Sequence, residues 1–217
     1  MIRVIILVWM LPVLVNAGIL IEPYAGYNVG LDLKTKLSRP STTQSFIVSA
    51  DTKSGQTFGG RLGYSFLNVF AAVDYSKTSF DIDEKTDRYI SGSFDTKFIP
   101  KITEVDETAL GIAVGVDIFI LRAWGKYLFD VKWESNPDYI VGVSYPHTVE
   151  LKGTGYAVGL GIKPLPFISL FAEYQMVTVD EWGIFTRNTD GLDRKGEFKL
   201  ERERKSLLIG ISVPIDI

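Results

Sequence analysis

Nine charged residues could do chemistry because they fall on one face of an alternating pattern along the chain. They are Glu22, Arg61, Asp74, Asp117, Arg122, Lys126, Asp130, Lys163 and Glu173. Five acids nearly balance four bases, so in a narrow and poorly hydrated space they are expected to form ion pairs. We expect Glu173 to pair with Arg61 or Lys126. Such a set forms either a polar conduit for small solutes or a salt-bridged plug.

Catalytic and metal-binding chemistry finds little support elsewhere. The single histidine, His147, has Ser144 and Glu150 near it in sequence, but neighbours on an extended strand project to alternate faces and do not make a triad. The chain contains no cysteine, so thiolate metal sites and disulfides are excluded. An acidic run at 81–87 is interleaved with basic residues, which indicates a solvated loop. We therefore expect no catalytic residue, no metal site and no cofactor.

The N-terminal residues have the layout of a secretory signal. Arg3 precedes an apolar stretch at 4–15 that is too short to span a bilayer comfortably, and small residues follow up to Ala17. We expect Sec-dependent export, cleavage after Ala17, and one domain over 18–217. The formal net charge of −3 gives no electrostatic argument for nucleic-acid binding.

Alternation with period 2 dominates the remaining sequence. At 153–163, for example, large apolar residues alternate with glycine and alanine, which is typical of strands and not of helices. The pattern predicts eight strands at 19–30, 55–66, 69–80, 106–118, 121–133, 153–163, 167–180 and 205–217. Each is about the 9–11 residues that a tilted strand needs to cross a bilayer, or slightly more. A ten-stranded arrangement using 139–145 is the alternative.

The connections between these strands alternate in length. Three are tight, at 67–68, 119–120 and 164–166, and four are long and polar, at 31–54, 81–105, 134–152 and 181–204. Short periplasmic turns and long extracellular loops are the topology of up-and-down transmembrane β-barrels, with both termini in the periplasm. The fourth long loop is rich in charges of both signs, which indicates a solubilising rim whose basic members could meet lipopolysaccharide phosphates.

The two faces of the predicted strands show which side meets lipid. Small and charged residues share one face, and the other is almost uninterrupted Leu, Ile, Val, Ala, Tyr and Phe. Eight strands enclose a lumen barely wider than the side chains that fill it, so the small and charged face must be the inner one. The same narrowness favours the plug over the conduit. We therefore expect an all-β, eight-stranded antiparallel barrel with an apolar outer surface.

Aromatic residues on the outer face support a membrane setting. They are Tyr27, Tyr64, Tyr75, Tyr127, Tyr156, Phe167 and Tyr174. Tyrosine at headgroup depth keeps its ring in the apolar layer and its hydroxyl in water, which gives the two aromatic girdles of membrane barrels.

The sequence resembles the small eight-stranded outer-membrane barrels, namely the transmembrane domain of OmpA, OmpX and the opacity-type surface proteins. Three stretches carry the resemblance: Glu22-Pro23-Tyr24-Ala25-Gly26-Tyr27-Asn28-Val29-Gly30, Gly155-Tyr156-Ala157-Val158-Gly159-Leu160-Gly161, and Leu170-Phe171-Ala172-Glu173-Tyr174. The resemblance implies an outer-membrane location and insertion by the barrel-assembly machinery. Many members end in phenylalanine, which that machinery reads, whereas this chain ends in Ile217.

Two classes of function remain open at this stage. The first is a monomeric structural or surface-interaction protein that works through its external loops, in contact with outer-membrane lipid and lipopolysaccharide. Three alternating stretches in the loops, at 46–48, 89–94 and 139–143, could extend the hairpins and offer sheet edges to an extracellular partner. The second is a narrow, porin-like channel or an OmpW-like transporter of small or hydrophobic molecules. We expect no enzymatic activity.

Overall fold

A computed structural model describes residues 17–38, 45–83, 102–137, 149–165, 167–183 and 198–217. Residues 1–16 of the predicted signal peptide, the loop stretches at 89–94 and 139–143, and His147 with Ser144 lie outside these residues. Among the described residues, no helix is long and apolar enough to cross a membrane.

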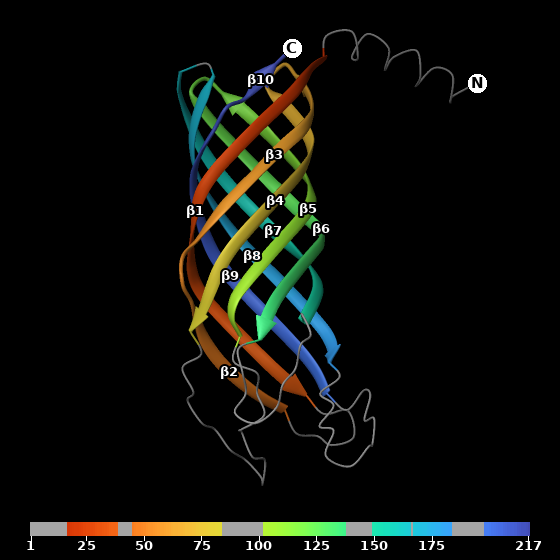
Figure 1. The fold of residues 1–217 in the computed structure, drawn as a ribbon. Coiled ribbons are helices and arrows are strands. Elements are labelled where there is room, and N and C mark those ends of the chain that lie inside the picture. Colours follow the sequence, from red (N-terminus) through yellow and green to blue (C-terminus); the bar gives the residue numbers. More distant parts are fainter. Residues whose placement is uncertain (1–16, 39–44, 84–101, 138–148, 166, 184–197) are drawn as a thin grey trace, which may run out of the picture.

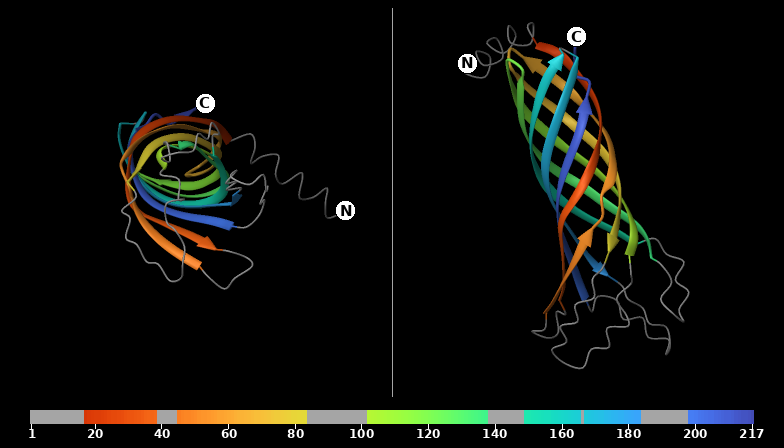
Figure 2. Two further views of the ribbon diagram at one scale, coloured as in Figure 1. Left: turned by 60° about the horizontal axis from the view of Figure 1, so that its bottom comes forward. Right: turned by 90° about the vertical axis from the view of Figure 1, so that its left-hand side faces the viewer.

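The fold is a closed antiparallel β-barrel (Figures 1 and 2). Its strands are β1 Ala17–Ser38, β2 Ser45–Thr52, β3 Gly55–Phe66, β4 Val69–Asp83, β5 Ile102–Ile118, β6 Leu121–Pro137, β7 Val149–Leu165, β8 Ile168–Gly183, β9 Phe198–Ser212 and β10 Ile215–Asp216. Each of β3 to β8 pairs with the next strand in sequence, β3 also pairs with β1, and β9 closes the barrel on β1. β2 continues the line of β3 along β1, and the short β10 continues the line of β9. The predicted eight-stranded antiparallel barrel is therefore confirmed.

The observed strands extend beyond the predicted ones, mainly at the end opposite the tight turns. β4 reaches Asp83, β5 begins at Ile102, and β9 begins at Phe198 instead of 205. The stretch at 46–48, which we expected to extend a hairpin, lies in β2 and pairs with β1. The two ends of the barrel thus differ: one carries the tight turns and the C-terminus, and we call the other the loop end (Figure 1).

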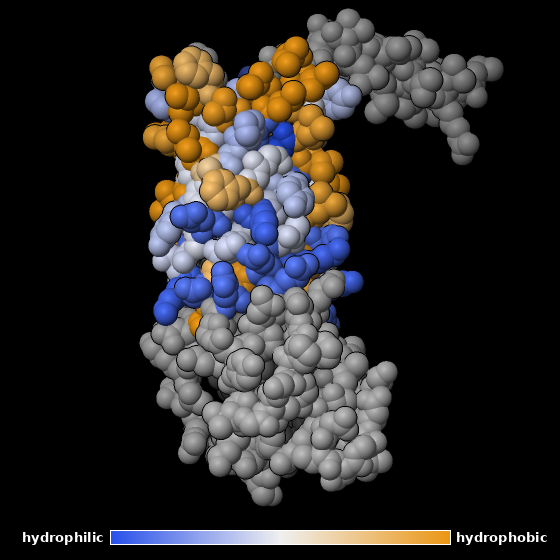
Figure 3. Space-filling model, in the orientation of Figure 1, coloured by the Kyte–Doolittle hydropathy of each residue, from blue (hydrophilic) through white to orange (hydrophobic). Residues whose placement is uncertain are grey.

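The outer surface changes character along the barrel axis. Toward the tight turns it is apolar, and toward the loop end it is hydrophilic (Figure 3). β4 shows the change within one strand: Val73 and Tyr75 are exposed apolar positions, and the next outward positions are Lys77, Ser79 and Asp81. We call the apolar zone the belt. Soluble monomers rarely expose a continuous apolar surface of this extent, so the belt is a lipid-facing surface.

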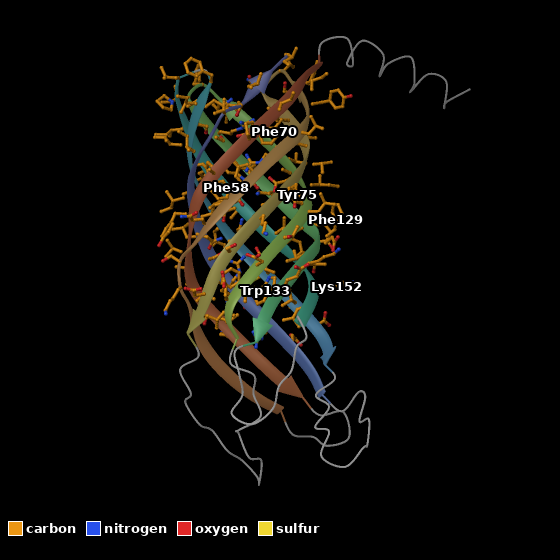
Figure 4. All side chains as sticks on the ribbon, viewed as in Figure 1. Phe58, Phe70, Tyr75, Phe129, Trp133 and Lys152 are labelled. Atoms are coloured by element: carbon orange, nitrogen blue, oxygen red, sulfur yellow. The ribbon has the colours of Figure 1, made fainter. Side chains whose placement is uncertain are left out.

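The interior changes in the opposite sense. Toward the tight turns it holds buried charges, together with a cluster of Leu20, Tyr24, Phe70, Ala72, Ala113, Trp124, Phe171 and Leu208. Toward the loop end it holds a larger apolar cluster of Leu33, Phe80, Ile82, Val105, Ala109, Leu128, Val131, Trp133, Leu151, Val177 and Val179. Phe70 and Trp133 mark the two levels (Figure 4). The loop-end half therefore has the apolar inside and polar outside of a barrel that stands in water, which the sequence analysis did not predict.

Irregularities in three strands lie near the change of character. In β1 the register shifts between Gly30 and Asp32, and in β6 it shifts between Leu128 and Val131. Lys53 and Ser54 separate β2 from β3. A bulge inserts one residue, so every later side chain in that strand moves to the other face.

Candidate functional site: a filled lumen and a charged collar

Arg61 is the centre of a buried layer of charges in the belt half of the lumen. Its Nη1 lies 3.3 Å from Oε2 of Glu22, its Nε 3.0 Å from Oδ2 of Asp74, and its Nη2 3.3 Å from Oε2 of Glu173. The three carboxylates come from β1, β4 and β8, so one guanidinium links strands on opposite sides of the barrel. All four side chains are buried. The predicted pairing of Glu173 with Arg61 is confirmed.

Lys126 is the second cation of this layer. Its Nζ lies 3.0 Å from Oδ2 of Asp74 and 2.8 Å from Oε1 of Glu173. Glu173 also accepts hydrogen bonds from the indole of Trp124 and from Nε2 of Gln175. Both carboxylates therefore have two cationic partners each, which offsets the cost of taking them out of water.

The layer continues toward the tight turns through Arg122. Its Nη1 lies 3.0 Å from Oε1 of Glu22, and its Nε lies 3.1 Å from Oδ1 of Asp117. Asp117 also pairs with Lys163, and this last pair is only partly buried. Four acids and four bases thus form one connected network, which we call the charge layer, with contributions from β1 and from every strand from β3 to β8.

Aromatic rings fill the space around these charges. The guanidinium carbon of Arg61 lies 4.5 Å from the ring centroid of Trp124, and that of Arg122 lies 4.2 Å from that of Phe70. A Cβ built on Gly159 would lie 2.2 Å from the Trp124 ring, so glycine at 159 makes room for the indole inside the barrel. Aromatic rings therefore pack against the buried cations of the charge layer.

The structure differs from the prediction at Asp130. This residue was expected in the lumen, but it follows the β6 bulge and pairs with Leu110, which lies on the outer face of β5. Phe129 is the inserted residue and is exposed. The bulge therefore moves Asp130 outside the charge layer, and the remaining eight predicted lumen charges balance.

A second ion pair is buried in the apolar half of the lumen. Nη2 of Arg204 lies 2.6 and 2.7 Å from the two carboxylate oxygens of Glu107. Nε1 of Trp133 donates to Oε2 of Glu107 at 2.6 Å, and Nη1 of Arg204 donates to the hydroxyl of Ser206 at 2.9 Å. Side chains of the apolar cluster surround this pair, and Phe80 lies beneath the guanidinium at 4.8 Å. A second level of the lumen therefore holds buried polar and apolar side chains.

The sequence analysis missed Glu107, Arg202 and Arg204. The two arginines were assigned to a solvated loop, but both are buried in β9. Arg202 and Arg204 are an even number of residues from the inward Ser206, so they lie on the same face of β9. Extending the alternation of the last predicted strand toward its start would have placed both arginines in the lumen.

The residues of the predicted aromatic girdles are all on the outer surface. Tyr27, Tyr64, Tyr75, Tyr127, Tyr156, Phe167 and Tyr174 are between 38% and 61% exposed. Tyr127 and Tyr156 are partners across β6 and β7, with ring centroids 5.2 Å apart. On β4 and β7 the next outward residues toward the loop end, Lys77 and Thr154, are polar, so tyrosine ends the belt on these strands.

Lysines follow the belt on six strands or their junctions. We call them the lysine collar: Lys34, Lys53, Lys77, Lys132, Lys152 and Lys205. Some of them also contact carboxylates, such as Lys77, whose Nζ lies 3.3 Å from Oδ2 of Asp106. Exposed pairs of this kind contribute little to stability. In the part of the chain that the structure describes, no group of three or more His, Cys, Asp or Glu is placed to hold a metal ion.

Comparisons with solved structures address the fold. The outer membrane protein OprG from Pseudomonas aeruginosa matches with a TM-score of 0.52 and 11% identity, over 93% of this chain and 98% of that one. The fold is that of a small outer-membrane β-barrel. Neisserial surface protein A matches at a TM-score of 0.41 and 15% identity, over 91% of this chain and 97% of that one. Ail of Yersinia pestis, in complex with the heparin analogue sucrose octasulfate, matches with a TM-score of 0.41 and 13% identity, over 89% of this chain and 98% of that one. No protein-family model and no curated protein matches the sequence.

Proposed function

We propose that this chain is an outer-membrane barrel with a closed lumen that acts as a structural or surface-interaction protein through its loop end. The filling of the lumen at two levels is the observation that carries the proposal. Glu173 and Glu107, one from each level, are 0% and 2% exposed, as expected where water and solutes do not pass. The narrow channel and the sideways transporter both need free space in the lumen, which the described side chains occupy.

The belt sets the position of the barrel in the membrane. On β5 the outward residues from Leu110 to Ile118 span about 27 Å along the strand. With a tilt of about 40° this is about 21 Å along the membrane normal, against about 25 Å for a typical apolar band. The belt thus comes within a few ångströms of the height of a typical apolar band, and the loop-end half projects into water. We infer that the tight turns face the periplasm, as in other barrels whose termini lie at that end.

The projecting half fits a role in presenting the loop end. Its apolar core and the buried pair of Glu107 and Arg204 make it a rigid extension of the transmembrane part. The tyrosines that end the belt fit the headgroup level, and the lysine collar above them fits the phosphates of outer-membrane lipid and lipopolysaccharide. Export by a signal peptide cleaved after Ala17, insertion by the barrel-assembly machinery, a monomeric state and an extracellular partner at the loop end remain parts of this proposal.

Thiol labelling along one strand tests this position, since the chain has no cysteine of its own. Val158→Cys and Thr154→Cys lie on the outer face of β7, four residues apart and on either side of Tyr156. We expect a charged, membrane-impermeant thiol reagent to modify Thr154→Cys in lipid nanodiscs at least about tenfold faster than Val158→Cys, because ionic reagents enter hydrocarbon poorly. Val73→Cys and Lys77→Cys repeat the test on β4. Equal rates within both pairs would show that the bilayer does not end at the collar.

A further inference from the structure

The tight-turn end of the barrel has an apolar rim. Leu67 and Phe119 are the first residues of the two-residue turns, and their side chains are 84% and 98% exposed. Ile120 is 62%, Phe167 56% and the C-terminal Ile217 76% exposed. We call these five residues the rim. A turn in water is commonly built from glycine, asparagine or aspartate, so large apolar side chains at three turns need another explanation.

The backbone of two rim residues sharpens the question. Leu67 and Phe119 have φ angles of 55° and 54°, in the left-handed region. Glycine and asparagine adopt this region readily, whereas other residues do so at a cost. Packing within the chain does not offset that cost, because the Phe119 side chain makes almost no contact with the protein. An environment outside the chain must favour these side chains.

Several backbone groups at the tight-turn end have partners on the neighbouring strand. The carbonyl oxygen of Asn68 accepts a hydrogen bond of 2.7 Å from the N–H of Asp117, and that of Ile120 accepts one of 2.7 Å from Lys163. Ile19 and Ile217 exchange two bonds of 2.8 and 3.0 Å. Each hairpin end is thus bonded to the next strand. Backbone that enters hydrocarbon needs this satisfaction, and backbone in water does not.

The rim is continuous with the belt. Val69, Ile118 and Leu121 border the turns on the outer surface and are all exposed. The apolar surface therefore runs to the end of the molecule, whereas the other edge of the belt meets charged residues (Figure 3). The belt alone also falls a few ångströms short of a typical apolar band, and the turns supply the missing height.

We propose that the rim contacts the acyl chains of the periplasmic leaflet. The tight turns are then on the periplasmic side of the membrane but at the depth of the acyl chains, and they do not project beyond the headgroups into the periplasm. A cavity of about 300 Å³ at this end is lined by the polar residues Ser65, Asn68 and Asp117 and by apolar residues that include Leu67 and Ile217 of the rim. The rim therefore anchors the barrel sideways in lipid. This inference rests on the membrane position proposed above.

Asparagine at the rim tests the inference because it should raise the folding equilibrium constant if the rim lies in water and lower it if the rim lies in lipid. In water, Phe119→Asn and Leu67→Asn relieve the backbone cost and remove few contacts within the chain, so the folding equilibrium constant should rise by up to about tenfold. In lipid, each substitution places a polar amide in the acyl region, and we expect the constant to fall about tenfold or more. Urea titration in phosphatidylcholine vesicles measures it. Val158→Asn is the lipid-facing control, and Glu104→Asn, at an exposed position of β5 in the loop-end half, is the water-facing one. A rise for both rim variants would overturn the inference.

Labelling of Phe119→Cys gives a second test that does not depend on stability. In phosphatidylcholine nanodiscs we expect it to react with a charged thiol reagent as slowly as Val158→Cys and much more slowly than Glu104→Cys. Fast reaction of Phe119→Cys together with slow reaction of Val158→Cys would overturn the lipid contact. Protection of Phe119→Cys in native membranes would not rescue it after that result, because a partner protein could cover the rim there. Fast reaction at both positions would instead refute the membrane position itself.

Discussion

Replacement of Arg61 by methionine should lower the free energy of unfolding of the barrel by about 3–5 kcal/mol, the range for removing one partner from a buried ion pair. Arg61 faces Glu22, Asp74 and Glu173, and all three stay buried in the variant. Glu22 then depends on Arg122, and the other two share Lys126. Urea titration in phospholipid vesicles, followed by tryptophan fluorescence, measures the loss.

Lys77→Gln is the matched control for Arg61→Met, because Lys77 also pairs with a carboxylate but lies on the outer surface. Its expected cost is below about 1 kcal/mol. Glu173→Gln should fall between the two, since the amide keeps hydrogen bonds but loses its charge beside Arg61 and Lys126. Equal stability of Arg61→Met and Lys77→Gln would show that the charge layer does not hold the barrel together.

Arg204→Met should be almost as costly as Arg61→Met, again by about 3–5 kcal/mol, for a different reason. It leaves the side chain of Glu107 among Phe80, Trp133 and other apolar side chains without its bidentate guanidinium partner, while the indole N–H still donates to it. Removing both charges should recover most of the loss, because a well-packed apolar pair often replaces a buried ion pair without cost. Urea titration of Arg204→Met and of the double variant Glu107→Leu/Arg204→Met measures both effects.

The comparison of single and double variants has a defined control in the charge layer. Arg61→Met combined with Glu173→Leu should recover little, because Glu22 and Asp74 remain beside the missing guanidinium. If Glu107→Leu/Arg204→Met were as unstable as Arg204→Met alone, the ion pair of Glu107 and Arg204 would add more to the free energy of unfolding than the neutralisation of each charge by the other. The view of this half as an ordinary apolar core would then be wrong.

The sequence predicts the barrel well because its strands alternate with few exceptions in the belt. At 108–118, for example, small or charged inward residues alternate with large outward ones, and the structure places them so. Pairing of the inward charges followed from the narrow lumen, although which cation meets Glu173 could be limited only to two candidates. The structure shows that both contact it.

The loop-end half could not be predicted by the same rule because the polarity of the two faces reverses there. In β4, Phe80 and Ile82 are inward while Ser79 and Asp81 are outward. In the belt, polar residues face the lumen and apolar residues face outward. Polar residues at outward positions therefore indicate a solvated loop by that pattern, and the predicted strands end before the observed ones. The β6 bulge is a second reason for error. Nothing in the residue types around Phe129 predicts that it is an inserted residue, and the insertion turns Asp130 outward.

Conductance of the purified full-length protein in planar lipid bilayers is the most direct test of the closed lumen. The two filled levels, at Arg61 and at Arg204, predict no discrete openings above the background of the bare bilayer at moderate voltage. The double variant Arg61→Ala/Glu173→Ala, if it remains folded, serves to show whether emptying one level is sufficient for a current. Regular, voltage-stable openings of the unmodified protein would contradict the closed barrel and favour a channel.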